Sequence, residues 1–442
     1  MWNSFVDDRT DSPDLGPEHK QGRSAMSNSK SILVCGGGIA GNAVALQLAR
    51  AGIATTVVER ASAPRPGGQA VDLRGPSRRV AERMGLMPGI RKRQLDERGM
   101  AFVDARGRKL VRMPVEMFDG RGIIADIEIT RGDLNQVLLD EIDALPASSG
   151  TVDYRYGEWA ERVREDADGV EVTFASGAVE RFDLVIGADG LHSALREQVF
   201  GPDESIVENL GGYISFFTVP TPSGLDLETG WVGVHIVPGS VFALRPDTNP
   251  ATSMAIISVG QPLVSGLRGD AAAQRQLIRE RLTGGGWMIP EVLAAMDDAP
   301  DFYFDELARV RLPSWSRGRV VLLGDAAFCG SPVTGMGTAL AIIGAYLLAG
   351  EIATTPDDHA RAFGRYEELL RPMVTAIQKG LETRVRLRHP RSRAGIALTL
   401  AIFRVITARS LAPLRSRLSK LLGDEADEFP LPDYSGRTEP AA

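Results

Sequence analysis

The sequence predicts an α/β fold in which a Rossmann-like nucleotide-binding domain is interrupted by a mixed β-sheet domain and followed by C-terminal helices. Three observations support this prediction. Residues 31–59 have the pattern of a strand, a helix and a second strand, with a glycine-rich turn before the helix. Two apolar runs that lead into glycine and aspartate, residues 182–190 and 319–325, have the pattern of further strands of the same sheet. The stretch between them has shorter runs of another kind, which indicates an inserted domain.

The first unit consists of three neighbouring segments. Residues 31–35 are a short apolar run, residues 39–50 carry apolar side chains at helical spacing, and residues 54–59 are rich in β-branched residues. Alternation of strand and helix over about thirty residues is typical of a parallel sheet. After the strand at 319–325 we expect a helix from about Thr338 to Glu351.

The inserted domain is expected to hold a sheet, because residues 211–260 contain β-branched and aromatic runs separated by Pro, Gly and Asp. Beyond residue 356 the chain reads as helical, with breaks at Pro390 and Pro413. The expected organisation is a disordered extension (1–30), a discontinuous nucleotide-binding domain (31–88, 126–200 and 301–355), an inserted domain (89–125 and 201–300) and a C-terminal helical segment (356–442).

Composition excludes several classes of function. The 442 residues carry a formal charge of −7, and no segment forms the dense basic face that a nucleic-acid partner requires. The two cysteines, Cys35 and Cys329, lie far apart, which argues against a disulfide framework and suits a reducing cytoplasm. None of the five histidines lies near a cysteine at ligand spacing, so we expect no metal site.

No membrane segment is expected either. Residues 1–30 are polar and lack the apolar core of a signal peptide. No apolar run approaches the length that spans a bilayer. The apolar stretch 396–408 is interpreted as a helix packed across the other two domains; a helix lying on a membrane surface is the alternative.

A dinucleotide fingerprint lies in the first turn, where Gly36, Gly38 and Gly41 fit the pattern G-x-G-x-x-G. The first glycine permits the tight turn, the second lets a phosphate approach the backbone, and the third lets helix and strand pack closely. Glu59 ends the second strand, where its carboxylate can accept hydrogen bonds from a ribose. The alternative is a glycine-rich turn without a ligand. The pattern occurs once in the chain and does not by itself distinguish NAD from FAD.

Two later segments identify the cofactor by resemblance. Residues 187–196, Gly-Ala-Asp-Gly-Leu-His-Ser-Ala-Leu-Arg, resemble the GADGxxSxxR segment of the class A flavoprotein hydroxylases, which include para-hydroxybenzoate hydroxylase and the tetracycline-inactivating monooxygenases. Residues 319–340, with Gly324-Asp325-Ala326-Ala327, Pro332 and Gly335-Met336-Gly337, resemble their second FAD segment. The resemblance covers roughly residues 31 to 350 in the same order and implies that the nucleotide is FAD.

The resemblance also implies roles for particular residues. Asp325 would bind the ribityl chain, and Pro332, Gly335 and Gly337 would bring backbone close to the isoalloxazine ring. The helix after this loop would direct its positive end at the ring. Many relatives have an asparagine in this loop, whereas this chain has Thr338 and Ala339 after Gly337. Side-chain contact from that position is therefore not carried over.

Further cofactor contacts are implied at matching positions. Asp189 and Gly190 would steady the pyrophosphate region, although Asp189 also suits a helix cap. Arg131 matches the arginine of the family that touches the cofactor, and Arg60 and Asp72 match other contact positions. Arg65 is a candidate contact for the nicotinamide donor; a solvated surface arginine is the alternative.

The expected reaction follows from the same resemblance. NADPH or NADH would reduce FAD, O2 would add at the flavin C4a carbon, and the resulting hydroperoxide would hydroxylate an aromatic or polyketide-like substrate held by the inserted domain. Three alternatives remain open. They are a dehydrogenase on the same fold, a non-catalytic scaffold of the Rab-escort type, and a flavin-dependent halogenase, whose tryptophan-rich signature is similar to residues 286–290.

One side chain of the inserted sheet is a candidate catalytic residue. In residues 231–236, Val232, Val234 and Ile236 form one apolar face, and Trp231, Gly233 and His235 form the other. We expect the sheet to form a wall of the substrate pocket, where Gly233 leaves room and His235 binds or deprotonates a phenol. The alternative is that His235 faces solvent or forms hydrogen bonds within the sheet.

Overall fold

A computed structural model describes residues 30–118, 127–247, 249–408 and 429–434. The disordered extension expected for residues 1–30 lies outside the described residues apart from Lys30. The final part of the expected C-terminal segment is described only at residues 429–434.

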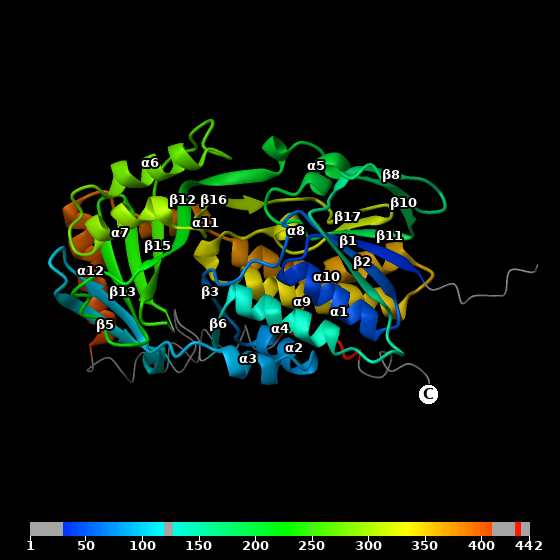
Figure 1. Ribbon diagram of the computed structural model, residues 1–442, viewed down its shortest axis with the longest axis horizontal. Helices are drawn as coiled ribbons and strands as arrows, with labels where there is room; N and C mark the ends of the chain where they lie inside the picture. The colour runs from blue at the N-terminus through cyan, green and yellow to red at the C-terminus, as the bar shows by residue number, and fades with distance from the viewer. Residues whose placement is uncertain (1–29, 119–126, 248, 409–428, 435–442) are drawn as a thin grey trace, which may run out of the picture.

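The nucleotide-binding half is built on a six-stranded sheet (Figure 1). Its central strands are parallel and almost completely buried, because apolar runs such as Ile32–Val34 face cover on both sides. The strands, in their order across the sheet, are β17 (Ser316–Arg317), β18 (Val320–Leu322), β11 (Leu184–Gly187), β1 (Ser31–Cys35), β2 (Ala54–Glu59) and β7 (Val152–Tyr156).

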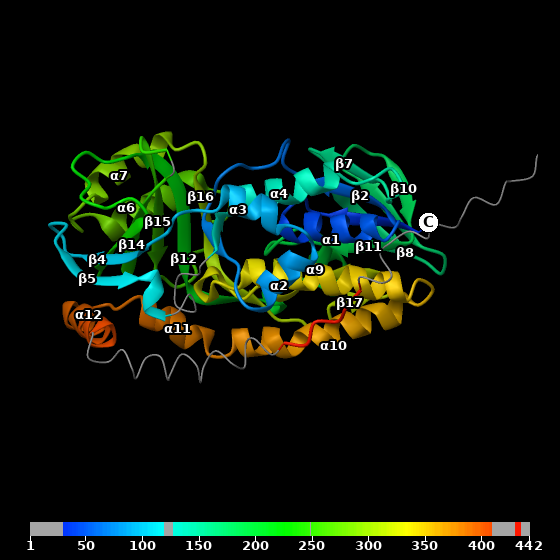
Figure 2. The ribbon, with the colours of Figure 1, turned by 90° about the horizontal axis from the view of Figure 1, so that it is seen from below.

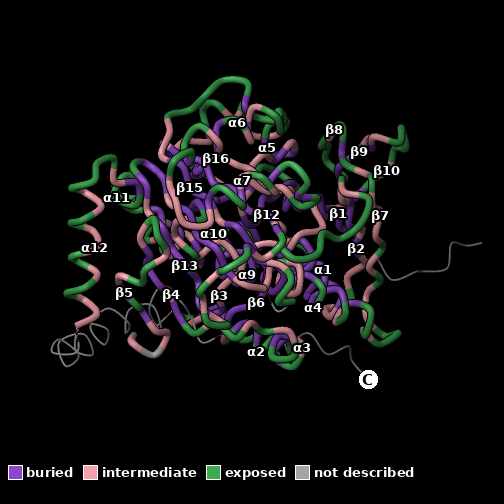
Figure 3. The backbone as a smooth tube through the Cα atoms, turned by 60° about the vertical axis from the view of Figure 1, so that its left-hand side comes forward, coloured by how far each residue is buried: buried purple, intermediate pink, exposed green. Residues whose placement is uncertain are grey.

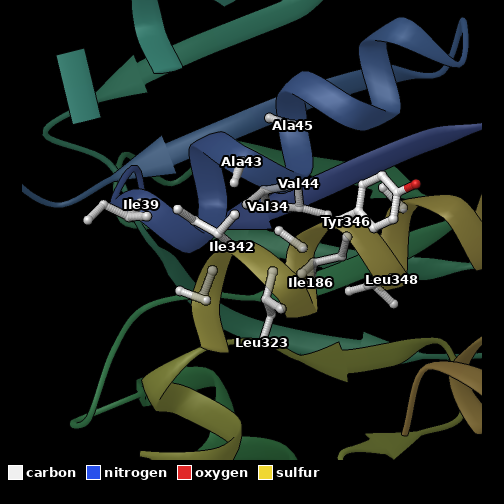
Figure 4. Packing of buried hydrophobic residues seen from close by; sticks show 14 of the residues in the cluster. Val34, Ile39, Ala43, Val44, Ala45, Ile186, Leu323, Ile342, Tyr346 and Leu348 are labelled. Carbon is white, nitrogen blue, oxygen red and sulfur yellow. The ribbon is translucent and has the colours of Figure 1, made fainter. Parts of the chain in front are cut away.

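Helices α1 (Ile39–Arg50) and α9 (Gly337–Thr354) pack on each other beside this sheet. Figure 4 shows the contact, in which Val44 of α1 and Ile342 of α9 lie near Val34 and Ile186 of the sheet. Helix α4 (Arg131–Asp143) flanks α1. The remaining elements of this half are α2 (Pro76–Arg83), α3 (Met87–Arg93), α5 (Ala194–Phe200), α8 (Asp325–Phe328), the ribbon of β3 (Ala70–Asp72) and β6 (Glu128–Thr130), and the small sheet of β10 (Val179–Phe182), β9 (Val170–Phe174) and β8 (Ala160–Glu165).

The second half is built on a seven-stranded mixed sheet. Neighbouring strands are antiparallel except β13 and β4, which are parallel. The strands in order are β16 (Tyr303–Val310), β12 (Val207–Pro220), β15 (Thr252–Val259), β14 (Ser240–Pro246), β13 (Trp231–Val237), β4 (Gly99–Val103) and β5 (Lys109–Pro114).

The two faces of this sheet have different cover. One face, with Phe217 and Phe242, packs against α6 (Ala271–Leu282) and α7 (Ile289–Ala295). The opposite face, with Ile214, Phe216 and Met254, packs partly against α11 (Leu381–Arg388). We call this second face the inner face. One row across it contains Tyr303, Phe216, Ile256, Ala243, Val234 and Phe102.

The C-terminal helices connect the two halves. Figure 2 shows α10 (His359–Gln378), α11 and α12 (Arg393–Thr407) following one another along one side of the molecule, from beneath α9 to β5. Helix α12 lies at the edge of the molecule (Figure 3) and contacts the seven-stranded sheet through Leu400 and Phe403. Its Leu398, Ile402 and Val405 are exposed.

Among the described residues, α9 is the only helix long and apolar enough to cross a membrane, and 78% of it is buried inside the protein. The sequence prediction that no apolar run approaches this length overlooked α9, whose apolar residues instead form the centre of the core.

The α/β fold class is confirmed, with a mixed second sheet and C-terminal helices. One expected boundary differs from the structure. Residues 301–310 were assigned to the nucleotide-binding half, but β16 pairs with β12 at the edge of the seven-stranded sheet. A strand's partners depend on long-range pairing, which the run of side chains along one strand does not specify.

Candidate functional site

The glycine turn has the geometry of a phosphate-binding loop. Gly36 has a φ of +112°, and a Cβ built there would lie 2.4 Å from the carbonyl oxygen of Ala188. A Cβ on Gly41 would lie 1.8 Å from the carbonyl oxygen of Gly36, so both positions require glycine for packing. A Cβ on Gly38 would meet nothing within 4 Å. No side chain caps the amino end of α1, so its first N–H groups can bind an anion.

Glu59 lies at the end of β2, beside this turn. Its Oε2 accepts a hydrogen bond from the Gly37 amide at 2.8 Å, and its Oε1 accepts one from the Ala61 amide at 2.8 Å. These bonds fix the carboxylate and leave each oxygen a second lone pair. The carboxylate can therefore still accept hydrogen bonds from ribose hydroxyls.

A buried amide network supports the turn, and the sequence interpretation missed it. Asn42 donates from Nδ2 to the Gly37 carbonyl at 2.9 Å and to Oδ1 of Asn135 at 2.8 Å. Its Oδ1 accepts a bond from the Tyr154 hydroxyl at 2.9 Å. An asparagine in the otherwise apolar first turns of α1 was the available signal, because a buried amide needs partners.

Asp189 and Arg196 connect the second motif to the rest of the site. Asp189 is the residue after Ala188, whose carbonyl oxygen lies against Gly36. The Oδ2 atom of Asp189 accepts a hydrogen bond from the Leu195 amide at 3.2 Å. Its Oδ1 is buried and has no hydrogen-bond partner among the described residues. Arg196 is fully buried and donates to the carbonyl oxygens of Leu191 and Ala326 at 2.6 and 3.0 Å. It thereby ties this motif to the Gly-Asp motif.

Asp325 is the first residue of α8 and follows Gly324. A Cβ built on Gly324 would lie 2.9 Å from the Cβ of Ala40 in α1. Burial raises the pKa of Asp325 above its usual value, and nearby Arg131 acts in the opposite direction. A Cβ on Gly337 would lie 3.8 Å from Oδ1 of Asp325. Asp325, Arg131 and the amino end of α9 therefore converge from three separate parts of the sequence.

The loop from Ser331 to Gly337 has unusual backbone. Ser331 has a φ of 64°, although it is not glycine, and within the described residues its buried Oγ has no hydrogen-bond partner. Gly335 has a φ of 66°, and a Cβ there would lie 4.0 Å from Oδ2 of Asp72. Pro332 starts the short turn between them. Left-handed backbone and an orphaned hydroxyl are typical of a ligand-binding loop.

The predicted arginines lie in different surroundings. Arg131 starts α4, where its amide donates to the Gln69 carbonyl, and a Cβ on Gly68 would lie 3.8 Å from the Arg131 Cβ. Arg60 is exposed beside Glu59, with its guanidinium 5.4 Å from the centre of the Trp159 ring. Arg65 is also exposed. Asp72 forms an ion pair with Arg74.

The inner face of the seven-stranded sheet meets the Ser331–Gly337 loop. Val333 of this loop and Tyr303 both pack against one cluster, which is formed by residues of the inner face such as Phe216 and by Leu381 and Val385 of α11. Apolar and aromatic side chains thus line the side of the sheet next to the loop.

His235 lies on the opposite face, which differs from the expected pocket. A Cβ on Gly233 would lie 2.5 Å from Cη2 of Trp287, so the room expected beside this glycine is filled. The His235 ring packs at 6.5 Å from the Trp287 ring. Its Nδ1 lies 2.9 Å from the Val103 carbonyl oxygen, and its Nε2 lies 2.8 Å from that of Gly285. The alternation of the strand was predicted, but which face α7 covers was not visible in the sequence.

These residues fit FAD. The open space at Gly38, the uncapped α1 and the preorganised Glu59 suit the adenine nucleotide half. The orphaned oxygens of Asp189 and Ser331 lie in the two motifs that follow. No group of three possible metal ligands occurs in the part of the chain that the structure describes.

Comparison with known proteins agrees with this geometry. The family model described as "FAD binding domain" matches residues 29–378. An uncharacterised protein of Mycobacterium tuberculosis is 40% identical over 338 residues, which cover 76% of this chain and 88% of that protein. A flavin-dependent monooxygenase of Legionella longbeachae is 38% identical, with 80% of this chain and 88% of the relative covered.

A solved structure shows the same architecture. The tetracycline destructase Tet(51) superposes with a TM-score of 0.75 at 34% identity and covers 92% of this chain and 100% of its own. The residues that the family model matches include the glycine turn, the two later motifs and the inserted sheet of this chain. This chain belongs to the class A FAD-dependent hydroxylases and is an FAD-dependent monooxygenase.

Proposed function

We propose that this enzyme uses O2 and NADPH or NADH to hydroxylate an aromatic or polyketide-like small molecule in the cytoplasm. The observation that carries the proposal is one apolar cluster that includes Phe216 of the inner face and side chains of α11. Ile256, Tyr303 and Val333, the last from the loop from Ser331 to Gly337, pack against it. A flat apolar substrate could pack between this face and a ring held at the loop. Tet(51) acts on tetracycline according to its name, which supports a polycyclic substrate.

The residues of the chain have distinct tasks in this proposal. Gly36, Gly38, Gly41 and Glu59 hold the adenine nucleotide half of FAD, and Asp325 holds the ribityl chain. Asp189 and Arg131 add polar contacts, and the amino end of α9 stabilises negative charge on the reduced ring. FAD, when bound, supplies the redox and oxygen-transfer chemistry.

The apolar inner face has a further task, which is to keep water away from the reacting atoms. Because the chain has one dinucleotide fingerprint, the nicotinamide donor binds transiently without a Rossmann unit of its own. Arg65 is exposed and lies two residues before Gly67, whose carbonyl accepts a hydrogen bond from the Gly132 amide at the start of α4. Arg65 is therefore proposed as a contact for the phosphate groups of the nicotinamide donor.

The test is a screen of phenols and polyketides for faster consumption of NADPH or NADH, followed by turnover under isotopically labelled O2. We expect one class of compound to accelerate consumption and the label to appear in the product. Asp325→Ala protein, which should bind FAD poorly, is the control for consumption without bound cofactor. A product that forms without the label would support the dehydrogenase alternative, and a halide-dependent product would support the halogenase alternative.

A further inference from the structure

A hydrogen-bonded set of three side chains links the two halves beside the candidate site. Asp305 of β16 accepts bonds from His192 Nε2 at 2.8 Å, from the Tyr303 hydroxyl at 2.9 Å and from the Glu306 amide at 2.8 Å. His192 belongs to the segment after Asp189, whereas Tyr303 and Asp305 belong to the seven-stranded sheet. Tyr303 is counted above only as part of the apolar inner face, and no task above uses the polar groups of these three side chains.

The direction of these bonds follows from the chemistry of Asp305. Burial acts to raise the pKa of Asp305, but the bond and charge of His192 and the bonds from Glu306 and Tyr303 outweigh it and lower the pKa. An ionised carboxylate only accepts hydrogen bonds, so the Tyr303 hydroxyl must donate to it. Burial and the charge of Asp305 raise the pKa of Tyr303, which keeps the proton on the phenol. The Tyr303 oxygen is therefore left as an acceptor.

Tyr303 lies on the inner face, which is the substrate-binding surface of the proposed function. It shares a row of the inner face with Phe216 and packs against the cluster that Val333, in the loop from Ser331 to Gly337, also contacts. Arg131 and Asp325 are close enough to influence its pKa. The residue is half-buried.

We infer that the Tyr303 oxygen accepts a hydrogen bond from a hydroxyl group of the substrate, and that Asp305 and His192 are positioning residues that fix this acceptor. Among the aromatic substrates of the proposed function, this bond would fix the position of the hydroxyl group. This inference rests on the proposed function. It involves binding only and requires no proton transfer.

The test compares two probes that differ in one hydrogen. 2-Naphthol has a phenolic hydroxyl that stays protonated at neutral pH, and 2-methoxynaphthalene lacks the donor. Their dissociation constants for the FAD-loaded protein are measured from the perturbation of the flavin absorbance. We expect the wild type to prefer 2-naphthol by roughly three- to tenfold, the worth of one net hydrogen bond. Tyr303→Phe should abolish this preference and leave the FAD dissociation constant within about twofold.

Tyr213→Phe is the matched control. Tyr213 lies on the neighbouring strand β12, but its ring packs on Phe304 and its hydroxyl accepts a bond from the Val264 amide at 2.7 Å. Like Tyr303→Phe, this substitution removes one tyrosine hydroxyl from the sheet, but on the face away from the loop. The preference for 2-naphthol should survive in this variant.

The positioning residues are tested by rescue. His192→Gln keeps an N–H donor for Asp305 and should retain most of the preference, whereas His192→Leu and Asp305→Asn should reduce it. A wild type that binds neither probe, or binds both equally, overturns the inference, as does an unchanged preference in Tyr303→Phe. The oxygen-label experiment gives its result independently. A labelled product from a compound without a hydroxyl group would therefore uphold the proposed function and overturn this inference.

Discussion

Asp325 and Glu59 are both carboxylates expected to bind the cofactor, but the protein holds them in different ways. Glu59 accepts two backbone amide bonds in the protein alone, so its position is fixed by the turn. Asp325 is buried in a setting that raises its pKa, so its charge is not fully compensated. A buried charge without full compensation destabilises a fold and becomes favourable when a ligand donates to it.

This difference predicts two distinct effects. Asp325→Asn should weaken FAD binding by roughly ten- to a hundredfold, because a charge-assisted bond is lost, and should not lower the stability of the FAD-free protein. Glu59→Gln should weaken FAD binding and also lower the free energy of unfolding of the FAD-free protein by about 1–3 kcal/mol, because one backbone amide loses its acceptor. Flavin fluorescence titration and urea unfolding measure the two quantities. Equal stability losses in both variants would contradict the distinction.

His235 is expected to act in the fold rather than in the chemistry. Both ring nitrogens face backbone carbonyls, and Trp287 covers the ring. His235→Ala should lower the free energy of unfolding by about 1–3 kcal/mol through lost bonds and packing. The coupling between oxidation of the nicotinamide donor, NADPH or NADH, and formation of product should not change. More peroxide leakage and an altered pH profile at unchanged stability would restore the catalytic interpretation.

At the scale of elements, the turn between β1 and α1 shows how one motif serves folding and binding separately. Gly41 is required because α1 crosses the Gly36 carbonyl, whereas Gly38 has open space beside it and a φ of −81°. A side chain at position 38 therefore costs the protein nothing until a phosphate arrives.

The matched substitutions are Gly38→Ala and Gly41→Ala. Gly38→Ala should fold with a melting temperature close to that of the wild type and should bind FAD at least tenfold more weakly, because its methyl group occupies the phosphate position. Gly41→Ala should be strongly destabilised, because a Cβ at 1.8 Å from a backbone oxygen cannot be accommodated. Thermal unfolding and flavin titration distinguish them. Tight FAD binding by Gly38→Ala would place the phosphates elsewhere.

The predictability of the elements has a physical limit. The strands and glycine turn of residues 31–59 were predictable because their signals are local in the sequence. The pairing of β16 with β12 was not predictable, because it joins Tyr303 to Phe216 and most of the sequence of the inserted domain lies between these residues. For the same reason the bond between His192 and Asp305 had no signal in either motif. The side of the sheet that faces the flavin loop was likewise fixed by α7 and α11, which lie far along the chain.

At the scale of the whole molecule, the two halves meet at a group of acidic side chains. Glu128 of β6 is buried, pairs with Asp72 of β3 across the ribbon and lies close enough to the carboxylate of Glu97 for the two to influence each other. Glu97 lies just before β4 and 3.6 Å from the guanidinium of Arg245 on β14. The group therefore runs from Asp72, beside Gly335 in the loop from Ser331 to Gly337, to the inner face of the seven-stranded sheet.

Burial, followed by the bond and charge of Glu97 and the influence of Asp72, raises the pKa of Glu128 far above its usual value. The folded protein thus keeps a proton that the unfolded chain releases. The contribution of Glu128 to stability is complete below the usual pKa of a glutamate and is lost as pH rises towards the raised pKa. The junction between the halves should therefore weaken in mildly alkaline solution.

Glu128→Gln tests this consequence, because the amide can donate to Glu97 without an ionisable proton. The variant should be more stable than the wild type at about pH 8, and the difference should shrink as the pH falls towards about 4, where much of the unfolded wild type is protonated at this position. Urea unfolding across this range measures the free energies. Glu82→Gln, an exposed carboxylate on α2, is the control and should track the wild type at every pH. If Glu128→Gln instead loses the same stability at every pH, Glu128 is ionised in the folded protein and Arg245, which lies near Glu97, must compensate the whole acidic group.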